Sequence, residues 1–252
     1  MKNIELFISK YYKLLIMIFV LVCGSFGVYA LNKPKTMRGV TIIKEQEKQD
    51  PEELSKKLYS LKKKERQAGI ANGSIDIFGL FDDYVIFGDS RALAFKDYGF
   101  LLENRIYAGT GHTIYNIDDW LPHLSTLKPL NIFVSYGVND IDSNFNGLPG
   151  GYEALAQEQI TKIKNTCPNS TIYVNSIIPA IEKGVQVNPV TWAELDEYNA
   201  ALQRVCDKNG WVFIDNSGLM TGEMVSLYEP DGIHFQPSFY PIWAENMISY
   251  LN

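Results

Sequence analysis

The feature that most constrains the fold is a regular alternation of short apolar segments with longer helical patterns, which begins near Asp83. The apolar segments are rich in β-branched and aromatic residues, as strands are. Five are expected to be strands: residues 84–88, 104–109, 131–137, 171–178 and 211–215. Helices are expected notably near residues 89–98, 151–165, 191–208 and 237–250. This order predicts an α/β domain whose five-stranded, mainly parallel sheet lies between two layers of helices.

A long apolar segment precedes this region. Residues 14–31 are 18 consecutive uncharged, mostly apolar residues, close to the ~20 that a helix needs to cross a bilayer. We expect a single membrane span there, with residues 1–13 in the cytoplasm and the remainder outside it. Because lysines flank the segment on both sides, charge alone does not fix this orientation. Cleavage of a signal peptide after Ala30, which would yield a secreted protein, is the alternative.

Residues 32–75 are polar and highly charged, and they are expected to form a partly helical linker. Asp50 is a plausible N-cap and Pro51 a suitable first helical residue. Three leucines recur at helical spacing within it, at positions 54, 58 and 61. They form a narrow apolar stripe that could pack on the domain or on another copy, although a solvated stalk is the favoured interpretation. The globular domain would then cover residues 76–252.

Charge and cysteine content limit the possible partners and cofactors. The net charge of −6 provides no overall basic field, so nucleic acid is not expected as a partner. Cys167 and Cys206 are far apart in sequence and lack metal-ligand spacing. They are expected in the core, and a single disulfide between them stays open.

The turn after the first expected strand carries a serine. In open parallel sheets, ligands bind outside the carboxyl ends of the strands. Gly88-Asp89-Ser90 joins such an end to a helical pattern, so the Ser90 hydroxyl would lie near a helix N-terminus and could serve as a nucleophile. By itself the tripeptide is explained equally well as a turn and a helix cap.

The next two strand ends offer hydrogen-bond donors. After the second, Gly109-Thr110-Gly111 would let a backbone N–H approach a developing oxyanion. A dinucleotide-binding loop is rejected, because Ile114 occupies the place of its third glycine. After the third strand, the Asn139 side chain could donate a second hydrogen bond to the same oxyanion.

A carboxylate and an imidazole follow the fifth strand. Asp231 precedes His234 by three residues, a spacing at which the carboxylate can orient the imidazole and stabilise its cation. Of the other two histidines, His123 is interpreted as structural. His112, beside the glycine turn, is a candidate substrate contact.

These pieces resemble the four sequence blocks of the SGNH, or GDSL-type, hydrolase superfamily over residues 80–252: Gly88-Asp89-Ser90, Gly111, Gly137-Val138-Asn139-Asp140 and Asp231-Gly232-Ile233-His234. The resemblance implies a flavodoxin-like three-layer fold, with Ser90 as nucleophile and with Asp231 and His234 completing the triad. It implies an oxyanion hole formed by Ser90, Gly111 and Asn139, with Gly109 as the fallback for Gly111. No metal or organic cofactor is expected.

The resemblance and the apolar segment together indicate an extracytoplasmic serine esterase. The expected substrate is an O-acyl, most simply O-acetyl, group on a cell-wall or secreted polysaccharide, removed by hydrolysis or moved by an acetyltransferase reaction. Other polysaccharide-modifying membrane proteins are possible partners. A lipid, thioester or small-ester hydrolase and a non-catalytic polysaccharide-binding protein of the same fold are the alternatives.

Substrate contacts are assigned to residues around these motifs. Arg91 stands where the family's older name has leucine, a departure that bears on substrate class, and it is a candidate substrate-binding residue. Tyr136 is another candidate. With Tyr152 and Trp192 it could stack on sugar rings or pack in the core.

Overall fold

The computed structural model describes residues 12, 16–17, 19–20, 50–185 and 188–251, which fall into two units, Met1–Lys64 and Glu65–Asn252. Most of the predicted membrane segment, residues 14–31, lies outside the described residues. In the described part of the chain, no helix combines the length and hydropathy of a membrane span.

The charged linker contains one long helix, α3 (Pro51–Ala71), which crosses the boundary between the two units. It begins as expected, because the Asp50 carbonyl accepts from the Leu54 amide at 3.0 Å. Leu54, Leu58 and Leu61 are each about half exposed.

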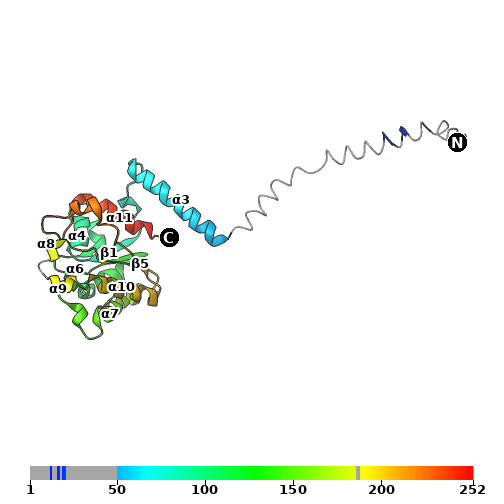
Figure 1. Cartoon of the computed structure of the whole chain (residues 1–252). Coiled ribbons are helices and arrows are strands. Elements are labelled where there is room, and N and C mark those ends of the chain that lie inside the picture. Colours follow the sequence, from blue (N-terminus) through cyan, green and yellow to red (C-terminus); the bar gives the residue numbers. More distant parts are fainter. Residues whose placement is uncertain (1–11, 13–15, 18, 21–49, 186–187, 252) are drawn as a thin grey trace. The chain divides into compact units, whose positions relative to one another are not determined.

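The sheet of the second unit has five strands in the order β2-β1-β3-β4-β5, and every neighbouring pair is parallel (Figure 1). The strands are β1 (Tyr84–Gly88), β2 (Ile106–Ala108), β3 (Asn131–Ser135), β4 (Thr171–Asn175) and β5 (Val212–Ile214). Each lies within a segment expected to be a strand. The predicted five-stranded parallel sheet is thus confirmed.

Five longer helices cover the two faces of the sheet: α4 (Ser90–Asp97), α5 (Ile117–Leu127), α7 (Gly151–Thr166), α10 (Leu195–Asn209) and α11 (Tyr240–Ser249). In Figure 1, α4 and α11 lie on one side of the strands, and α7 and α10 lie on the other. Alternate strand residues enter the two cores. Ile86 and Phe133 pack with α4 and α11, whereas Phe87 packs with α5, α7 and α10. Each fully buried side chain of this size contributes about 1.5–3 kcal/mol to folding.

Helix α5 was not among the helices singled out from the sequence. Pro122 lies inside it, and a proline there removes one backbone hydrogen bond. The helix is retained because Ile117 and Leu124 are fully buried against the sheet. Tertiary packing therefore outweighs the local signal.

Short helices complete the described unit: η1 (Phe78–Leu80), η2 (Glu103–Arg105), η3 (Ile114–Asn116), α6 (Val138–Asp142), η4 (Phe145–Gly147), α8 (Glu182–Val185), α9 (Pro189–Trp192), η5 (Gly222–Leu227) and η6 (Pro237–Phe239). Cys167 and Cys206 are buried and free, so their expected core role is confirmed and no disulfide joins them. Burial raises the pKa of the Cys206 thiol to about 12.

Candidate active site

The strand order places a topological switch point between β1 and β3. From β1 the chain first adds β2 on one side and then β3 on the other. Gly88, the last residue of β1, pairs with Ser135, the last residue of β3, so both strands end at the same level. Loops leaving such neighbouring ends diverge and form a crevice in which open α/β sheets bind ligands.

Ser90 lies at this crevice because β1 passes directly into α4. All five residues of β1 are buried, which fixes the strand in the sheet. Asp89 caps α4, its carboxylate accepting from the Arg91 amide at 2.9 Å. Ser90 is therefore the first residue of the helix, with its hydroxyl beside the positive end of the helix dipole.

A serine, an imidazole and a carboxylate form a hydrogen-bonded series at this position. The Ser90 Oγ lies 2.8 Å from His234 Nε2, although the two residues are 144 positions apart. His234 Nδ1 lies 2.7 Å from Asp231 Oδ2. With the Nδ1 proton directed at the carboxylate, Nε2 is free to accept the serine proton. Such an array can activate a serine as a nucleophile.

Both carboxylate oxygens of Asp231 are engaged. One accepts from the imidazole, and the other accepts from the backbone amides of Ile233 at 2.8 Å and His234 at 2.9 Å. Partial burial acts to raise the pKa of Asp231. The hydrogen bonds from the imidazole and the two amides together outweigh this effect and lower the pKa to about 2. The carboxylate consequently stays ionised at neutral pH.

Asn139 and Asp140 hold the loop that follows β2. The Asn139 side-chain nitrogen donates to the His112 carbonyl at 2.8 Å. The neighbouring Asp140 is fully buried, and its Oδ1 accepts from the Ile114 amide at 2.9 Å. Two consecutive residues of α6 therefore fix the loop at both ends of the His112–Ile114 turn.

The two glycines of this loop are needed for different reasons. Gly111 has a φ of +74°, in the left-handed region that favours glycine. A Cβ at Gly109 would lie 2.4 Å from the His112 imidazole. Gly111 therefore permits the turn, whereas Gly109 makes room for the partly buried His112.

Two carboxyls within the sequence motifs, those of Asp89 and Asp140, are buried and connect neighbouring loops. Asp89 also accepts from the Val138 amide at 3.3 Å, which joins the turns after β1 and β3. Burial raises the pKa of Asp140 to about 8; the Ile114 amide opposes this and Asp89 adds to it. Both aspartates belong to the sequence motifs, but the local sequence pattern does not indicate that their carboxyls are buried.

The structure corrects several expected substrate contacts. Arg91 is only 3% exposed, and its guanidinium donates to the carbonyls of Ile178, Pro179 and Ile233. It is therefore enclosed by the protein and not available to stack against or bind a substrate directly.

The aromatic residues considered for sugar stacking belong to the core. Tyr136 and Tyr152 are buried in the core on the side of the sheet that α5, α7 and α10 cover. Trp192 is also buried, and its indole N–H donates to Asp142 at 2.9 Å. His123 is exposed, and its ring lies near those of Tyr107 and Trp120.

Within the residues that the structure describes, no cluster of three or more histidine, cysteine, aspartate or glutamate side chains could hold a metal ion.

Comparison with known families identifies the class of protein. The sequence profile of the GDSL-like Lipase/Acylhydrolase family matches residues 87–241. That range includes Ser90, Asn139, Asp231 and His234, and it covers most of the sheet. The chain belongs to the GDSL-like lipase/acylhydrolase family, within the SGNH superfamily, as the sequence motifs predicted.

Solved structures share this fold at low sequence identity. A GDSL-like lipase from Bacteroides thetaiotaomicron is 18% identical with a TM-score of 0.51, covering 66% of this chain and 85% of its own. A lipase/acylhydrolase from Enterococcus faecalis is 14% identical with a TM-score of 0.52, covering 66% and 94%. A catalytic mutant of an acetylxylan esterase from Geobacillus stearothermophilus is 15% identical with a TM-score of 0.50, covering 67% and 94%. No curated protein is significantly similar in sequence.

Proposed function

We propose that this chain is a serine esterase in which Ser90 is the nucleophile, His234 the general base and Asp231 the residue that orients His234. The observation that carries the proposal is the hydrogen-bonded series from Ser90 Oγ through the imidazole to Asp231, with distances of 2.8 and 2.7 Å. His234 Nε2 takes the serine proton as Ser90 Oγ attacks the ester carbonyl carbon. The ionised Asp231 stabilises the resulting imidazolium.

The oxyanion of the tetrahedral intermediate would be held by the backbone amides of Ser90 and Gly111 and by the Asn139 side chain. Asn139 uses one of its two amide hydrogens on the His112 carbonyl, which leaves the other for the oxyanion. Its position is thereby fixed before substrate arrives, and preorganised donors of this kind are worth about 10²–10³ in turnover each.

The second half of the reaction returns the enzyme to its starting state. The imidazolium gives its proton to the departing alcohol oxygen as the carbonyl–oxygen bond breaks, which leaves an acyl-serine at Ser90. Water then attacks this ester and gives a proton to His234. The imidazolium passes that proton to Ser90 Oγ as the bond between Oγ and the acyl carbon breaks, and the carboxylic acid leaves. A sugar hydroxyl in place of water would make the reaction a transfer.

For the substrate, we propose O-acetyl groups on a cell-wall or secreted polysaccharide, acted on outside the cytoplasm. Two observations support this choice. The apolar residues 14–31 and the charged linker suit a catalytic domain held at a membrane surface. An acetylxylan esterase is also among the proteins that share the fold. Membrane proteins that build or modify the same polysaccharide are proposed as partners.

Substrate comparison tests the proposal. The full chain in mild detergent should release acetate from p-nitrophenyl acetate and from acetylated xylan, and it should act poorly on a long-chain p-nitrophenyl ester. Ser90→Ala should abolish acetate release while leaving the protein folded. A preference for the long-chain ester would favour a lipid or thioester substrate, and an undiminished rate in Ser90→Ala would refute the serine mechanism.

A further inference from the structure

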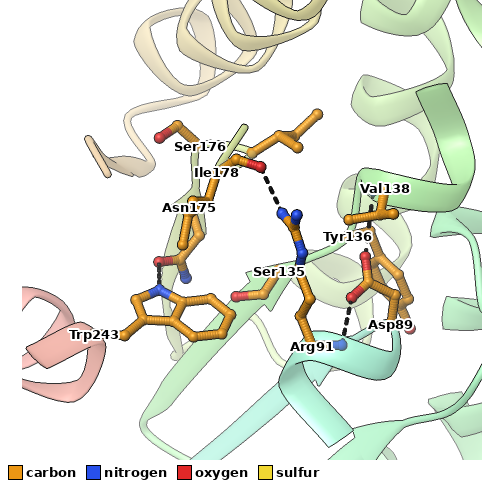
Figure 2. A pocket seen from close by; sticks show the side chains of 10 residues that line it. Asp89, Arg91, Ser135, Tyr136, Val138, Asn175, Ser176, Ile178 and Trp243 are labelled. Carbon is orange, nitrogen blue, oxygen red and sulfur yellow. Dashed lines mark hydrogen bonds between the residues drawn. The ribbon is translucent and has the colours of Figure 1, made fainter. Parts of the chain in front are cut away.

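Arg91 directly follows the proposed nucleophile, Ser90, and its side chain is buried. The guanidinium is buried among backbone carbonyls, and Figure 2 shows it directed at the carbonyl of Ile178. The cavity beside it, lined by Asp89, Ser135 and Trp243 among others, has a volume of about 10 Å³, room for about one water molecule. This space cannot admit an acyl group or a sugar, so the arginine serves the protein itself.

The guanidinium contacts both residues that flank His234. Arg91 Nε donates to the carbonyl of Ile233 at 2.8 Å. On the other side of His234, the guanidinium carbon lies 4.6 Å from the centroid of the Phe235 ring, within the range of a cation–π interaction. Arg91 thus contacts the residues immediately before and after His234.

The same guanidinium reaches the loop that follows β4. It donates to the carbonyls of Ile178 and Pro179, the latter at 3.2 Å. The loop after β4 also contacts the segment that carries His234 (residues 231–235, the histidine loop) directly, because the Ile181 amide donates to the Gly232 carbonyl at 2.9 Å. Arg91 therefore joins three chain segments, and only a fork with several donors in one plane can do so.

The cost of burying a charge indicates that an arginine is present here because it holds neighbouring chain segments in position. A charged group in the interior is costly unless all of its donors find acceptors, and an apolar side chain of similar volume would avoid that cost. Each of the three guanidinium nitrogens donates to a carbonyl oxygen, and the buried Asp89 supplies negative charge nearby. The backbone of α4 is held as well, since the Tyr240 hydroxyl donates to the Arg91 carbonyl at 3.0 Å.

We propose that Arg91 is a positioning residue that sets His234 at hydrogen-bonding distance from Ser90 by holding Ile233 and Phe235. This inference rests on the proposed serine mechanism. Without the guanidinium, the histidine loop keeps the hydrogen bonds to Asp231 but loses the hydrogen bond that joins Ile233 to Arg91 on the helix that carries the nucleophile. A misplacement of about 1 Å is enough to lower turnover about 10²-fold.

The test compares Arg91→Met and Arg91→Lys with Arg105→Met in the full chain. Arg105 is a matched control, because its guanidinium also donates to a backbone carbonyl and lies over an aromatic ring. Both belong to Tyr84, and the hydrogen bond is 3.2 Å long. Arg91→Met should lower kcat for p-nitrophenyl acetate about 10²-fold with little change in KM. Arg91→Lys, which keeps the charge but not the fork, should recover part of that loss, and Arg105→Met should keep the parental kcat. Arg91→Lys also covers the case in which the methionine variant does not fold.

A second readout needs no turnover. The imidazole NMR signals of His234, identified with His234→Asn, should shift in the Arg91 variants and stay unchanged in Arg105→Met. Parental kcat and parental His234 signals in a folded Arg91 variant would overturn the positioning role. If the parent neither turns over esters nor reacts with a serine-directed phosphonate, the proposed function fails instead, and the His234 signals alone then decide the role of Arg91.

Discussion

The two halves of the candidate site are built in contrasting ways. Ser90 opens a helix that follows a fully buried strand, and its neighbour Asp89 is buried with hydrogen bonds to two backbone amides. Asp231 and His234 instead lie on an irregular segment between η5 and η6, where their side chains are 48% and 41% exposed. The nucleophile is therefore part of the core scaffold, whereas the imidazole is more exposed and is held by its hydrogen bonds and by the contacts of Arg91 with its two neighbours.

The contrast indicates how substitutions in each half should act. Core packing holds the serine, so changes around it should affect the free energy of unfolding as much as activity. The side chains of Asp231 and His234 are themselves about half exposed, so changes at these two residues should lower turnover with a smaller effect on stability. Regions with few buried contacts are also the first to open locally.

The largest effect is expected from removing either end of the proton-transfer pair. Ser90→Ala and His234→Ala should each lower kcat by a factor on the order of 10⁶, because nucleophile and base act as one unit. For the same reason the double variant should be no slower than either single variant. Steady-state hydrolysis of p-nitrophenyl acetate measures this, and additive losses in the double variant would show that the two residues act separately.

Asp231→Asn should lower kcat by about 10⁴, because an amide nitrogen facing Nδ1 favours the wrong imidazole tautomer. Because the pKa of Asp231 is held near 2, its protonation should not limit activity in the wild-type protein until the pH falls to about 3. Thermal unfolding should change little, since the side chain is half exposed. A pH–rate profile with a wild-type activity loss near pH 4 that disappears in the variant would contradict this account.

Asn139→Ala should lower kcat by about 10²–10³ through loss of an oxyanion donor. Asn188→Ala is a matched control, because Asn188 also donates from its side chain to a backbone carbonyl, that of Asp142 at 3.0 Å. Kinetics of both variants with p-nitrophenyl acetate should show the loss only in Asn139→Ala. Equal losses in the two would assign the effect to loop stability.

Asp140→Asn should change the pH dependence of stability more than activity. Burial raises the pKa of Asp140 to about 8 in the folded protein, against about 3.9 in an unfolded chain. The folded state therefore binds the proton more tightly. The contribution of the protonated Asp140 to the free energy of unfolding is fully present below about pH 4. It falls by about 1.4 kcal/mol per pH unit up to about pH 8.

The asparagine variant keeps an acceptor for the Ile114 amide but has no proton to lose. Its unfolding free energy should therefore rise relative to wild type between about pH 5 and about pH 8, as measured by urea denaturation. A difference between the two proteins that does not vary with pH would contradict a buried, neutral Asp140.

Sequence predicted the parts of the fold that depend on local pattern. Strand segments and most long helices followed from apolar periodicity, and the position of Ser90 at a strand end followed from the turn after Gly88. The family also followed, because its motifs fall at the ends of successive strands. Helix α5 was missed, since Pro122 obscured a pattern that only packing on the sheet sustains.

The environment of individual polar side chains could not be predicted in the same way. Arg91 was assigned to substrate because it stands where the family's older name has leucine, yet three backbone carbonyls from distant segments enclose it. Tyr136 and Trp192 were considered for sugar stacking and are buried. Such placements depend on contacts between residues far apart in the chain, and local sequence patterns do not record them.

The most direct test of the central claim is covalent labelling by a serine-directed phosphonate, located by mass spectrometry of the full chain. We expect one phosphonylated residue, Ser90, with the label lost in Ser90→Ala and formed far more slowly in His234→Ala. Labelling at another residue, or labelling of Ser90 at an equal rate without His234, would contradict a site in which the imidazole activates this serine.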